Sequence, residues 1–358
     1  MKTPDQTAVD RKRLLGRLFP DGVPTLWCPL ITHYQPDGAI DAERMAAHLR
    51  HLAPDVKGFL IPGSTGDGWE MDAKEIRRLL EIALEQTTRL KLHLLIGVLR
   101  TDAEGAKRAF IDTVEWLKPR TGTDDEEACL AKSRICGFTV CPPRGADLSQ
   151  ETIRDGLEEI LAIGLPTALY QLPQVTQNEL SPDLVSDLAR AFPNFILFKD
   201  TSGADHVALS GRRLEGVFLV RGAEGDYVRW LKSVGGPYDG FLLSTANGFG
   251  RELRRLIEDL SAGRMDAARE RSDRLTAAVS EVFGAVAGLP HGNPFANANK
   301  ALDHFFAYGP QAANRPAPRL HAGPSLPEEA IRAAGNSLLR HGLMPVQGYL
   351  ESQPAAAP

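Results

Sequence analysis

The sequence has few of the residues that metal centres and disulfide scaffolds require. Only four of its 358 residues are cysteines, and Cys28, Cys129, Cys136 and Cys141 show no C-x-x-C spacing. We interpret them as buried or unreactive free thiols. None of the nine histidines forms an evident ligand cluster with acidic residues at the predicted strand ends, so we expect no metal site.

Long apolar runs and an excess of positive charge are also missing. No run of about 18 apolar residues occurs, and residues 1–20 contain no apolar core of a signal peptide. The formal net charge is −5 and the pI about 6.0, which gives no general attraction to nucleic acid or anionic membranes. We expect a cytoplasmic protein that binds a small molecule, with no nucleic-acid or membrane partner.

Short apolar, β-rich segments alternate with helical patterns along most of the chain. Eight such segments begin at residues 25, 56, 91, 135, 166, 195, 217 and 238. The helical patterns include 72–86 and 181–192, and the second opens with Ser181 as N-cap and Pro182 in the first turn. This alternation requires parallel strands joined by right-handed crossovers.

The predicted fold class is α/β, a (β/α)8 TIM barrel with additional C-terminal helices. An open doubly wound sheet has the same local pattern, but the G-x-G-x-x-G of a dinucleotide fold does not follow the first strand. We interpret 121–133 as a polar insertion on the face opposite the active site, without a catalytic role. The expected parts are an N-terminal helical extension (1–21), the barrel (22–250), a C-terminal helical region (251–346) and a disordered tail (347–358).

The sixth predicted strand, FILFKD, ends in an unusual residue, Lys199. Active sites of such barrels lie at the carboxyl ends of the strands. Burial in an apolar pocket disfavours the charged form of a lysine, and the free amine can then attack a ketone and form a Schiff base. The alternative is a lysine whose head group reaches solvent from the strand end, and spacing alone leaves both explanations open.

Two further strand ends offer partners for such a lysine. The fifth strand ends in ALYQLP and presents the phenol of Tyr170, which could transfer a proton or simply belong to the core. The second ends in IPGSTGDG. The backbone N–H groups and two hydroxyls of Gly63, Ser64 and Thr65 could bind a carboxylate or phosphate, although these residue types also make ordinary turns.

Taken together, GSTGD after the second strand, YQLP after the fifth and FKDTSG after the sixth resemble the signatures of the dihydrodipicolinate synthase / N-acetylneuraminate lyase family. The resemblance extends from about residue 22 to about residue 345 and includes TAN at 245–247. It implies Schiff-base chemistry on a 2-oxo acid without a metal or organic cofactor. It also implies a homotetramer, often a dimer of dimers.

The resemblance implies roles for individual residues. Lys199 would be the Schiff-base lysine and Tyr170 the proton-transferring tyrosine, while Ser64 and Thr65 would hold the carboxylate of the 2-oxo acid. The other candidate substrate-binding residues are Gly63, Leu242 and Arg144.

Two positions depart from the synthases of this family. Val175 follows the tyrosine motif where those enzymes have an arginine that binds a second carboxylate, so we do not expect synthesis of dihydrodipicolinate. Arg144 stands at or near the place of a tyrosine that those enzymes extend into a neighbouring subunit's site. An arginine there could bind a distal anionic group of the substrate or lie exposed on the surface.

We therefore expect a class I aldolase or lyase that cleaves or forms a carbon–carbon bond, with pyruvate as product or donor. Its substrate would be a 2-oxo-3-deoxy sugar acid or a related compound. The alternatives are a sugar-acid dehydratase similar to 5-dehydro-4-deoxyglucarate dehydratase, a 4-hydroxy-tetrahydrodipicolinate synthase, and a non-catalytic barrel that binds a 2-oxo acid. The scattered histidines disfavour a metal-dependent class II aldolase.

Overall fold

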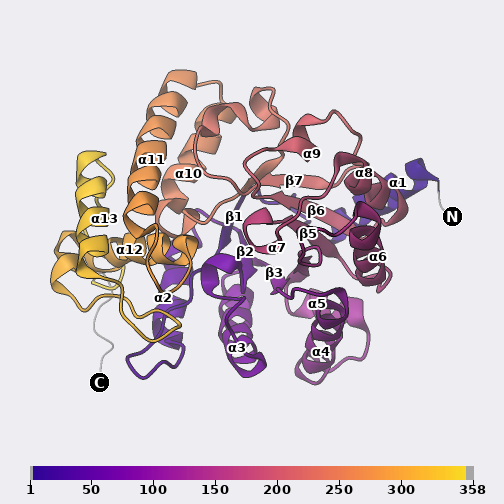
Figure 1. The fold of residues 1–358 in the computed structure, drawn as a ribbon, viewed down its shortest axis with the longest axis horizontal. Helices are drawn as coiled ribbons and strands as arrows, with labels where there is room; N and C mark the ends of the chain where they lie inside the picture. Colours follow the sequence, from indigo (N-terminus) through magenta and orange to yellow (C-terminus); the bar gives the residue numbers. More distant parts are fainter. Residues whose placement is uncertain (1–2, 352–358) are drawn as a thin grey trace. The chain divides into compact units, whose positions relative to one another are not determined.

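The computed structural model describes residues 3–351 and contains a closed barrel whose parallel strands follow one another in sequence order (Figure 1). All eight predicted strands are present, and the predicted barrel with extra C-terminal helices is confirmed. Nearly every strand residue is buried, which explains why these segments are continuous apolar runs. The strands are β1 (Leu26–Pro29), β2 (Gly58–Ile61), β3 (His93–Val98), β4 (Ile135–Val140), β5 (Thr167–Gln171), β6 (Phe195–Asp200), β7 (Phe218–Arg221) and β8 (Gly240–Leu242).

Helices connect the strands and continue the chain after β8. Within the described residues, no helix is long and apolar enough to cross a membrane. Those up to the last strand are α1 (Pro4–Leu18), α2 (Ala42–Leu52), α3 (Ala73–Arg89), α4 (Ala103–Thr121), α5 (Glu126–Lys132), α6 (Gln150–Leu161), α7 (Pro173–Thr176), α8 (Pro182–Ala191) and α9 (His206–Leu209). Those after it are α10 (Ala246–Ser261), α11 (Met265–Val286), α12 (Pro294–Tyr308) and α13 (Glu328–Arg340).

The predicted helix starts are confirmed where a capping residue marks them. Asp72 and Glu75 form a reciprocal capping box at the start of α3. The Ser181 side chain accepts a hydrogen bond from the N–H of Leu184 at the start of α8. The caps satisfy backbone groups that a helix end would otherwise leave without partners.

Two segments differ from the sequence expectations. The insertion 121–133 is not a plain loop, because it contains α5, which begins after an Asp125 N-cap. Helix α12 lies within the expected C-terminal helical region (251–346), although the sequence analysis gave it no bounds of its own, and most of its residues are buried. Of the tail expected to be disordered, residues 347–351 are described and 352–358 lie outside the described residues.

The chain divides by its internal contacts into two compact units. The first comprises Met1–Trp27, His93–Ala223 and Trp230–Leu242, and the second comprises Cys28–Leu92, Glu224–Arg229 and Leu243–Pro358. Among the candidate site residues, Lys199, Tyr170, Arg144 and Leu242 belong to the first unit, and Gly63, Ser64 and Thr65 to the second.

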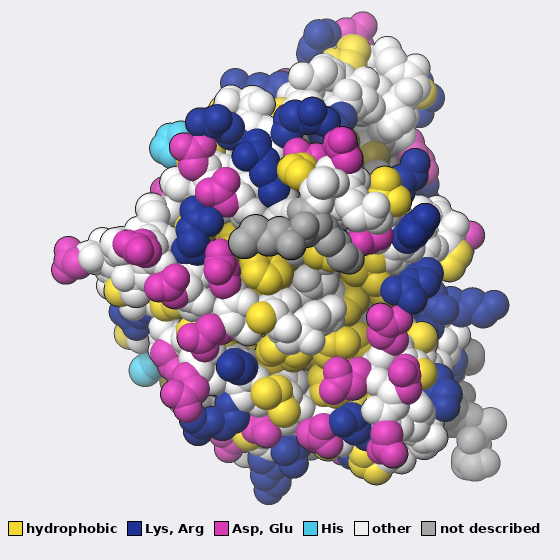
Figure 2. Space-filling view, turned by 90° about the vertical axis from the view of Figure 1, so that its right-hand side faces the viewer, with side chains coloured by type: hydrophobic (Ala, Val, Ile, Leu, Met, Phe, Trp, Pro, Cys, Tyr) yellow, Lys and Arg dark blue, Asp and Glu magenta, His cyan; other side chains and the backbone are white. Residues whose placement is uncertain are grey.

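The mixture of charges on the surface and the burial of the cysteines agree with the sequence analysis. On the face shown in Figure 2, basic and acidic side chains are interspersed, as the small net charge suggests. All four cysteines are buried and free, so the interpretation as buried free thiols is confirmed.

Candidate active site

Lys199 and Tyr170 lie side by side at the ends of two neighbouring strands. Lys199 on β6 is in register with Tyr170 on β5 and Val220 on β7, and neighbours in register project to the same face of a sheet. The Lys199 Nζ atom lies 3.8 Å from the centroid of the Tyr170 ring. The two residues are only 3% and 2% exposed. The structure therefore brings these two sequence-predicted residues together and buries the lysine.

Gly222 and Cys141 are neighbours of the Lys199 side chain. Gly222, which follows β7, has no room for a side chain, because an added Cβ would lie 3.0 Å from Lys199 Cε and 2.4 Å from Thr201 Oγ1. Cys141, which follows β4, is also buried. Burial raises the pKa of the Cys141 thiol to about 12, while the positive charge of Lys199 acts in the opposite direction. Gly222 and Cys141 thus shape the lysine environment, and sequence reasoning missed both.

Thr201 offers a hydroxyl two residues beyond Lys199. The residue is 6% exposed, and its Oγ1 atom has no hydrogen-bond partner among the described residues. A buried hydroxyl without a partner is costly, so it is available to a ligand or a water molecule. The sequence signal for it was the threonine inside FKDTSG, which the sequence analysis quoted without assigning it a role.

The opposite side of the β6 end is fixed by a polar network. The Asp200 carboxylate accepts hydrogen bonds from the backbone N–H (2.9 Å) and hydroxyl (2.6 Å) of Ser202. Burial raises the pKa of Asp200, and the hydrogen bonds from Ser202 counteract that rise. Nearby, Asp205 accepts from Tyr238 at 2.6 Å and from Arg221 at 3.0 Å. These contacts hold the strand end that carries Lys199.

The second unit contains the GSTGD turn, defined here as residues 63–67. Ser64 and Thr65 lie in the 3-10 turn η1 (Ser64–Gly66) directly after β2 and are 6% and 4% exposed. Gly66 must be glycine, because an added Cβ would lie 2.3 Å from the Leu30 carbonyl oxygen. A 3-10 turn leaves its first backbone N–H groups without partners inside the turn, which suits an anionic ligand.

Residues distant in sequence hold the GSTGD turn in place. Asn293, the N-cap of α12, donates to the Ser64 carbonyl oxygen at 3.1 Å. Lys300, also on α12, forms a buried ion pair of 2.7 Å with Asp67, and the Tyr34 hydroxyl donates to the same carboxylate at 3.0 Å. Helix α12 therefore supports the candidate carboxylate-binding turn, a role that the sequence analysis did not anticipate.

The TAN motif also has a structural role within the second unit. The Glu224 carboxylate accepts from the Thr245 backbone N–H at 3.0 Å and from its hydroxyl at 2.7 Å. Asn247 donates to the Pro29 carbonyl at 3.0 Å, and its side-chain oxygen accepts from the N–H of Ile31 at 3.0 Å. The motif thus fixes the start of α10 and the residues after β1.

The remaining predicted residues are placed as follows. Leu242 is buried at the end of β8, in register with Trp27. Gly63 is buried and extended, with φ −105°. Arg144 is exposed, and its backbone N–H donates to the Thr101 carbonyl at 2.8 Å. Val175 lies on the short helix α7. No ligand contact tests the binding roles of these residues, which stay predictions.

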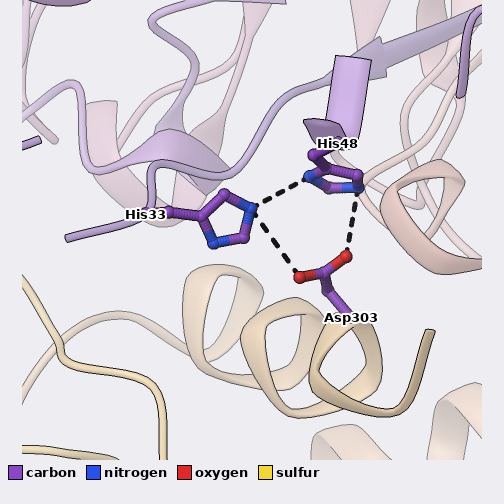
Figure 3. A group of neighbouring side chains, drawn as sticks. All are labelled: His33, His48 and Asp303. Carbon is purple, nitrogen blue, oxygen red and sulfur yellow. Dashed lines mark hydrogen bonds and ion pairs between the residues drawn. The ribbon is translucent and has the colours of Figure 1, made fainter. Parts of the chain in front are cut away.

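Two histidines and an aspartate form a buried group in the second unit, as Figure 3 shows. His33 Nε2 lies 3.1 Å from His48 Nδ1, and the Asp303 carboxylate oxygens lie 3.7 Å and 3.3 Å from His33 Nε2 and His48 Nε2. His, His and Asp are suitable metal ligands, and the sequence analysis did not bring these three residues together.

Hydrogen bonds already engage the atoms of this group. His48 Nε2 lies 2.8 Å from the Asn247 carbonyl oxygen, which can only accept, so this nitrogen carries the proton. His48 Nδ1 then accepts from His33 Nε2. Asp303 accepts from Arg44 at 3.0 Å, and that guanidinium would repel a cation. We interpret the group as a buried hydrogen-bond network that anchors α12.

Comparison with known proteins finds a family model and several proteins whose sequences are similar to this chain. Residues 131–290 match the model of the dihydrodipicolinate synthetase family. The 4-hydroxy-tetrahydrodipicolinate synthase of Symbiobacterium thermophilum is 26% identical over 250 residues, which cover 67% of this chain and 75% of that protein. A protein of Escherichia coli K12 named "Putative 2-dehydro-3-deoxy-D-gluconate aldolase YagE" is 27% identical over 177 residues, covering 48% of this chain and 52% of its own length.

Solved structures share the fold. The crystal structure of YagE from E. coli K12 in complex with pyruvate has a TM-score of 0.70 and 20% identity, covering 89% of this chain and 99% of that one. A variant of the 2-keto-3-deoxygluconate aldolase of Sulfolobus solfataricus has a TM-score of 0.65 and 16% identity, covering 90% and 99%. The segment matched by the family model carries Tyr170, Lys199 and Thr201.

Proposed function

We propose that this protein is a class I aldolase, a carbon–carbon lyase that cleaves or forms a bond next to a 2-oxo acid through a Schiff base on Lys199. The observation that carries the proposal is the buried Lys199 side chain, whose Nζ lies 3.8 Å from the Tyr170 ring centroid. A buried, water-poor setting favours the neutral amine that attacks a carbonyl. The family relatives support the same reaction class.

The proposed reaction needs only side chains of this chain. The Lys199 amine attacks the C2 carbonyl, Tyr170 donates the proton with which water leaves, and the products are an iminium ion and the tyrosine phenolate. Tyr170 removes the proton of the C4 hydroxyl, the C3–C4 bond breaks, and the electron pair moves into the iminium to form an enamine. The aldehyde leaves, Tyr170 passes the proton that it took to C3, and hydrolysis of the iminium releases pyruvate and the free amine and returns a proton to the Tyr170 phenolate.

The substrate carboxylate is assigned to the GSTGD turn. Ser64 and Thr65 would donate hydrogen bonds to it, and Gly63 and Leu242 are further proposed substrate-binding residues. The unpartnered Thr201 hydroxyl near Lys199 supports a polar substrate with hydroxyl groups. Both segments follow barrel strands at their carboxyl ends, where (β/α)8 enzymes bind substrates.

The residue at position 175 favours a sugar acid with a single carboxylate. Val175 stands on α7 in place of an arginine, and its apolar side chain cannot bind a second carboxylate. The exposed Arg144 could bind a distal anionic group. The aldolase named among the relatives agrees with a 2-oxo-3-deoxy sugar acid. We further propose that the protein acts in the cytoplasm and that it forms the homotetramer that the family resemblance implies.

Release of pyruvate tests the reaction type. We would incubate the purified protein with 2-oxo-3-deoxy sugar acids and follow pyruvate with NADH and lactate dehydrogenase. We expect NADH oxidation that depends on the protein and disappears in a Lys199→Ala variant. Loss of the sugar acid with formation of a dehydrated oxo acid but no pyruvate would favour the dehydratase alternative. A chelator should leave the rate unchanged, whereas inhibition would favour a metal-dependent aldolase.

A further inference from the structure

Trp69 makes a directional hydrogen bond to the candidate carboxylate-binding turn. Its indole Nε1 lies 2.8 Å from the Ser64 hydroxyl oxygen. An indole N–H is a donor and never an acceptor, so Ser64 Oγ must be the acceptor in this pair. Trp69 is half-buried and Ser64 is 6% exposed, so the hydrogen bond is largely shielded from water.

This bond decides what the Ser64 hydroxyl can do. A serine hydroxyl has one hydrogen to donate and two lone pairs that accept. Trp69 occupies a lone pair, so the hydroxyl hydrogen must point to another acceptor. The Ser64 carbonyl oxygen separately accepts from the Asn293 amide at 3.1 Å and from the Asp67 backbone N–H at 3.3 Å. The turn is therefore held by its backbone, and the hydroxyl remains for a ligand.

We propose that Trp69 is a positioning residue that fixes the Ser64 hydroxyl as a hydrogen-bond donor to the carboxylate of the 2-oxo acid. This inference rests on the proposed function. A carboxylate offers only acceptors, and a serine hydroxyl whose hydrogen is turned away from the Trp69 indole can donate to it. Fixing the donor before the ligand arrives lowers the ordering cost of binding.

The bond also limits proton movement through Ser64. A hydroxyl passes a proton along a chain only if its neighbour can accept one, and the indole N–H cannot. Ser64 therefore cannot pass a proton to Trp69. The proton of the proposed reaction is left to Tyr170, and Ser64 acts in binding. This predicts an effect of Trp69 on the affinity for the oxo acid and little effect on the chemical steps.

The test uses pyruvate as the ligand and borohydride reduction as the readout. Intact-protein mass spectrometry would give the pyruvate concentration at which half of the protein is trapped as the reduced adduct. The variant Trp69→Phe removes the N–H and keeps an aromatic ring. Trp116→Phe, at a half-buried tryptophan of α4 in the other unit, is the matched control. Ser64→Ala and the double variant complete a double-mutant cycle.

We expect Trp69→Phe to raise the half-saturating pyruvate concentration about three- to tenfold without lowering the maximal adduct yield. Trp116→Phe should match the wild-type protein. In the Ser64→Ala background, Trp69→Phe should have no further effect, because the hydroxyl that it orients is gone. A purely structural role of Trp69 would lower stability and give additive effects.

The other outcomes distinguish a failure of the positioning role from a failure of the proposed function. An unchanged half-saturation in Trp69→Phe, or an equal shift with and without the Ser64 hydroxyl, overturns the positioning role while leaving the Schiff-base proposal intact. Failure of the wild-type protein to form any adduct with pyruvate or with longer 2-oxo acids would instead overturn the proposed function, and this inference with it.

Discussion

Two lysines are buried in the described part of the chain, and they differ in the element that carries them and in the groups that they contact. Lys199, 3% exposed, is carried by strand β6, and its Nζ lies over the Tyr170 ring at 3.8 Å. Lys300, 1% exposed, is carried by helix α12, and its Nζ lies over the Tyr34 ring at 4.7 Å. Lys300 also forms an ion pair of 2.7 Å with Asp67.

The comparison bears on the proposal that Lys199 is the reactive lysine, because Lys300 has a structural explanation for its burial. The Asp67 carboxylate engages the Lys300 amine in a buried ion pair, so Lys300 holds the GSTGD turn. The neighbours that shape the Lys199 pocket include the Tyr170 ring, Gly222 and the Cys141 thiol. Burial of a lysine is therefore not by itself a sign of catalysis, and the groups around its Nζ decide.

The largest effect is expected for Lys199→Met. Without the amine no Schiff base can form, so pyruvate release should fall below detection. The variant should unfold with a free energy within about 1 kcal/mol of wild type, because methionine fills a similar volume without a desolvated charge. Activity assays and urea unfolding measure the two quantities. Substantial remaining turnover would refute the assignment of Lys199 as the nucleophile.

Next in size is Tyr170→Phe, which keeps the ring beside Lys199 and removes the hydroxyl. The rate of pyruvate release should fall roughly 10²- to 10⁴-fold, the usual contribution of a general acid or base. Borohydride should still trap an adduct, because the amine remains. Wild-type turnover in this variant would assign the proton transfer to another group.

Lys300→Met should show the opposite pattern to Lys199→Met. Removing one partner leaves the Asp67 carboxylate buried, which should lower the free energy of unfolding by about 3–5 kcal/mol. Lys74→Met, at an exposed lysine of α3, is the control and should change stability by less than about 0.5 kcal/mol. The double variant Lys300→Met with Asp67→Leu should recover part of the loss, since both charges are then gone. A stable Lys300→Met variant would contradict the structural role.

The smallest effect is expected for His33, which belongs to the buried hydrogen-bond network that anchors α12. Burial, with the Arg44 guanidinium next in effect, lowers the pKa of His33 well below its ordinary value of 6.5. Below that pH the unfolded chain binds a proton that the folded chain still excludes. The free energy of unfolding is therefore fully retained above pH 6.5 and falls by up to about 1.4 kcal/mol per pH unit below it, until the folded-state pKa is reached.

Urea unfolding at several pH values measures this slope. His33→Gln keeps a donor toward His48 and removes the titrating ring. The free energy of unfolding of this variant should therefore fall less steeply with decreasing pH, by the contribution of about one bound proton. Other buried histidines with lowered pKa values, such as His304, contribute equally in both proteins. Identical slopes for the wild type and His33→Gln would show that His33 does not titrate in this range.

The sequence predicts the lysine half of the site well. Strands of apolar residues in a β/α alternation place Lys199 and Tyr170 at neighbouring strand ends, and parallel register then brings the side chains together. Gly222 and Cys141 escaped prediction because neither residue type signals a pocket by itself. Only the folded register shows that Gly222 faces the lysine stem.

The sequence predicts the supports of the GSTGD turn poorly. Helix α12 reads PFANANKALDHFFAY, and its polar residues Asn297, Lys300 and Asp303 are all buried, so no polar face marks it as a surface helix. Their burial is tolerated because partners such as Asp67 and Arg44 come from more than two hundred residues away in sequence. Periodicity contains no information about such distant pairs.

Reductive trapping tests the central claim most directly. The wild-type protein and the Lys199→Met variant would be treated with pyruvate and sodium borohydride, and the modified peptide would be identified by mass spectrometry. We predict one reduced pyruvyl adduct on the wild-type protein, located on Lys199 and not on Lys300, and none on the variant. An adduct on another lysine, or equal labelling of both proteins, would contradict the account.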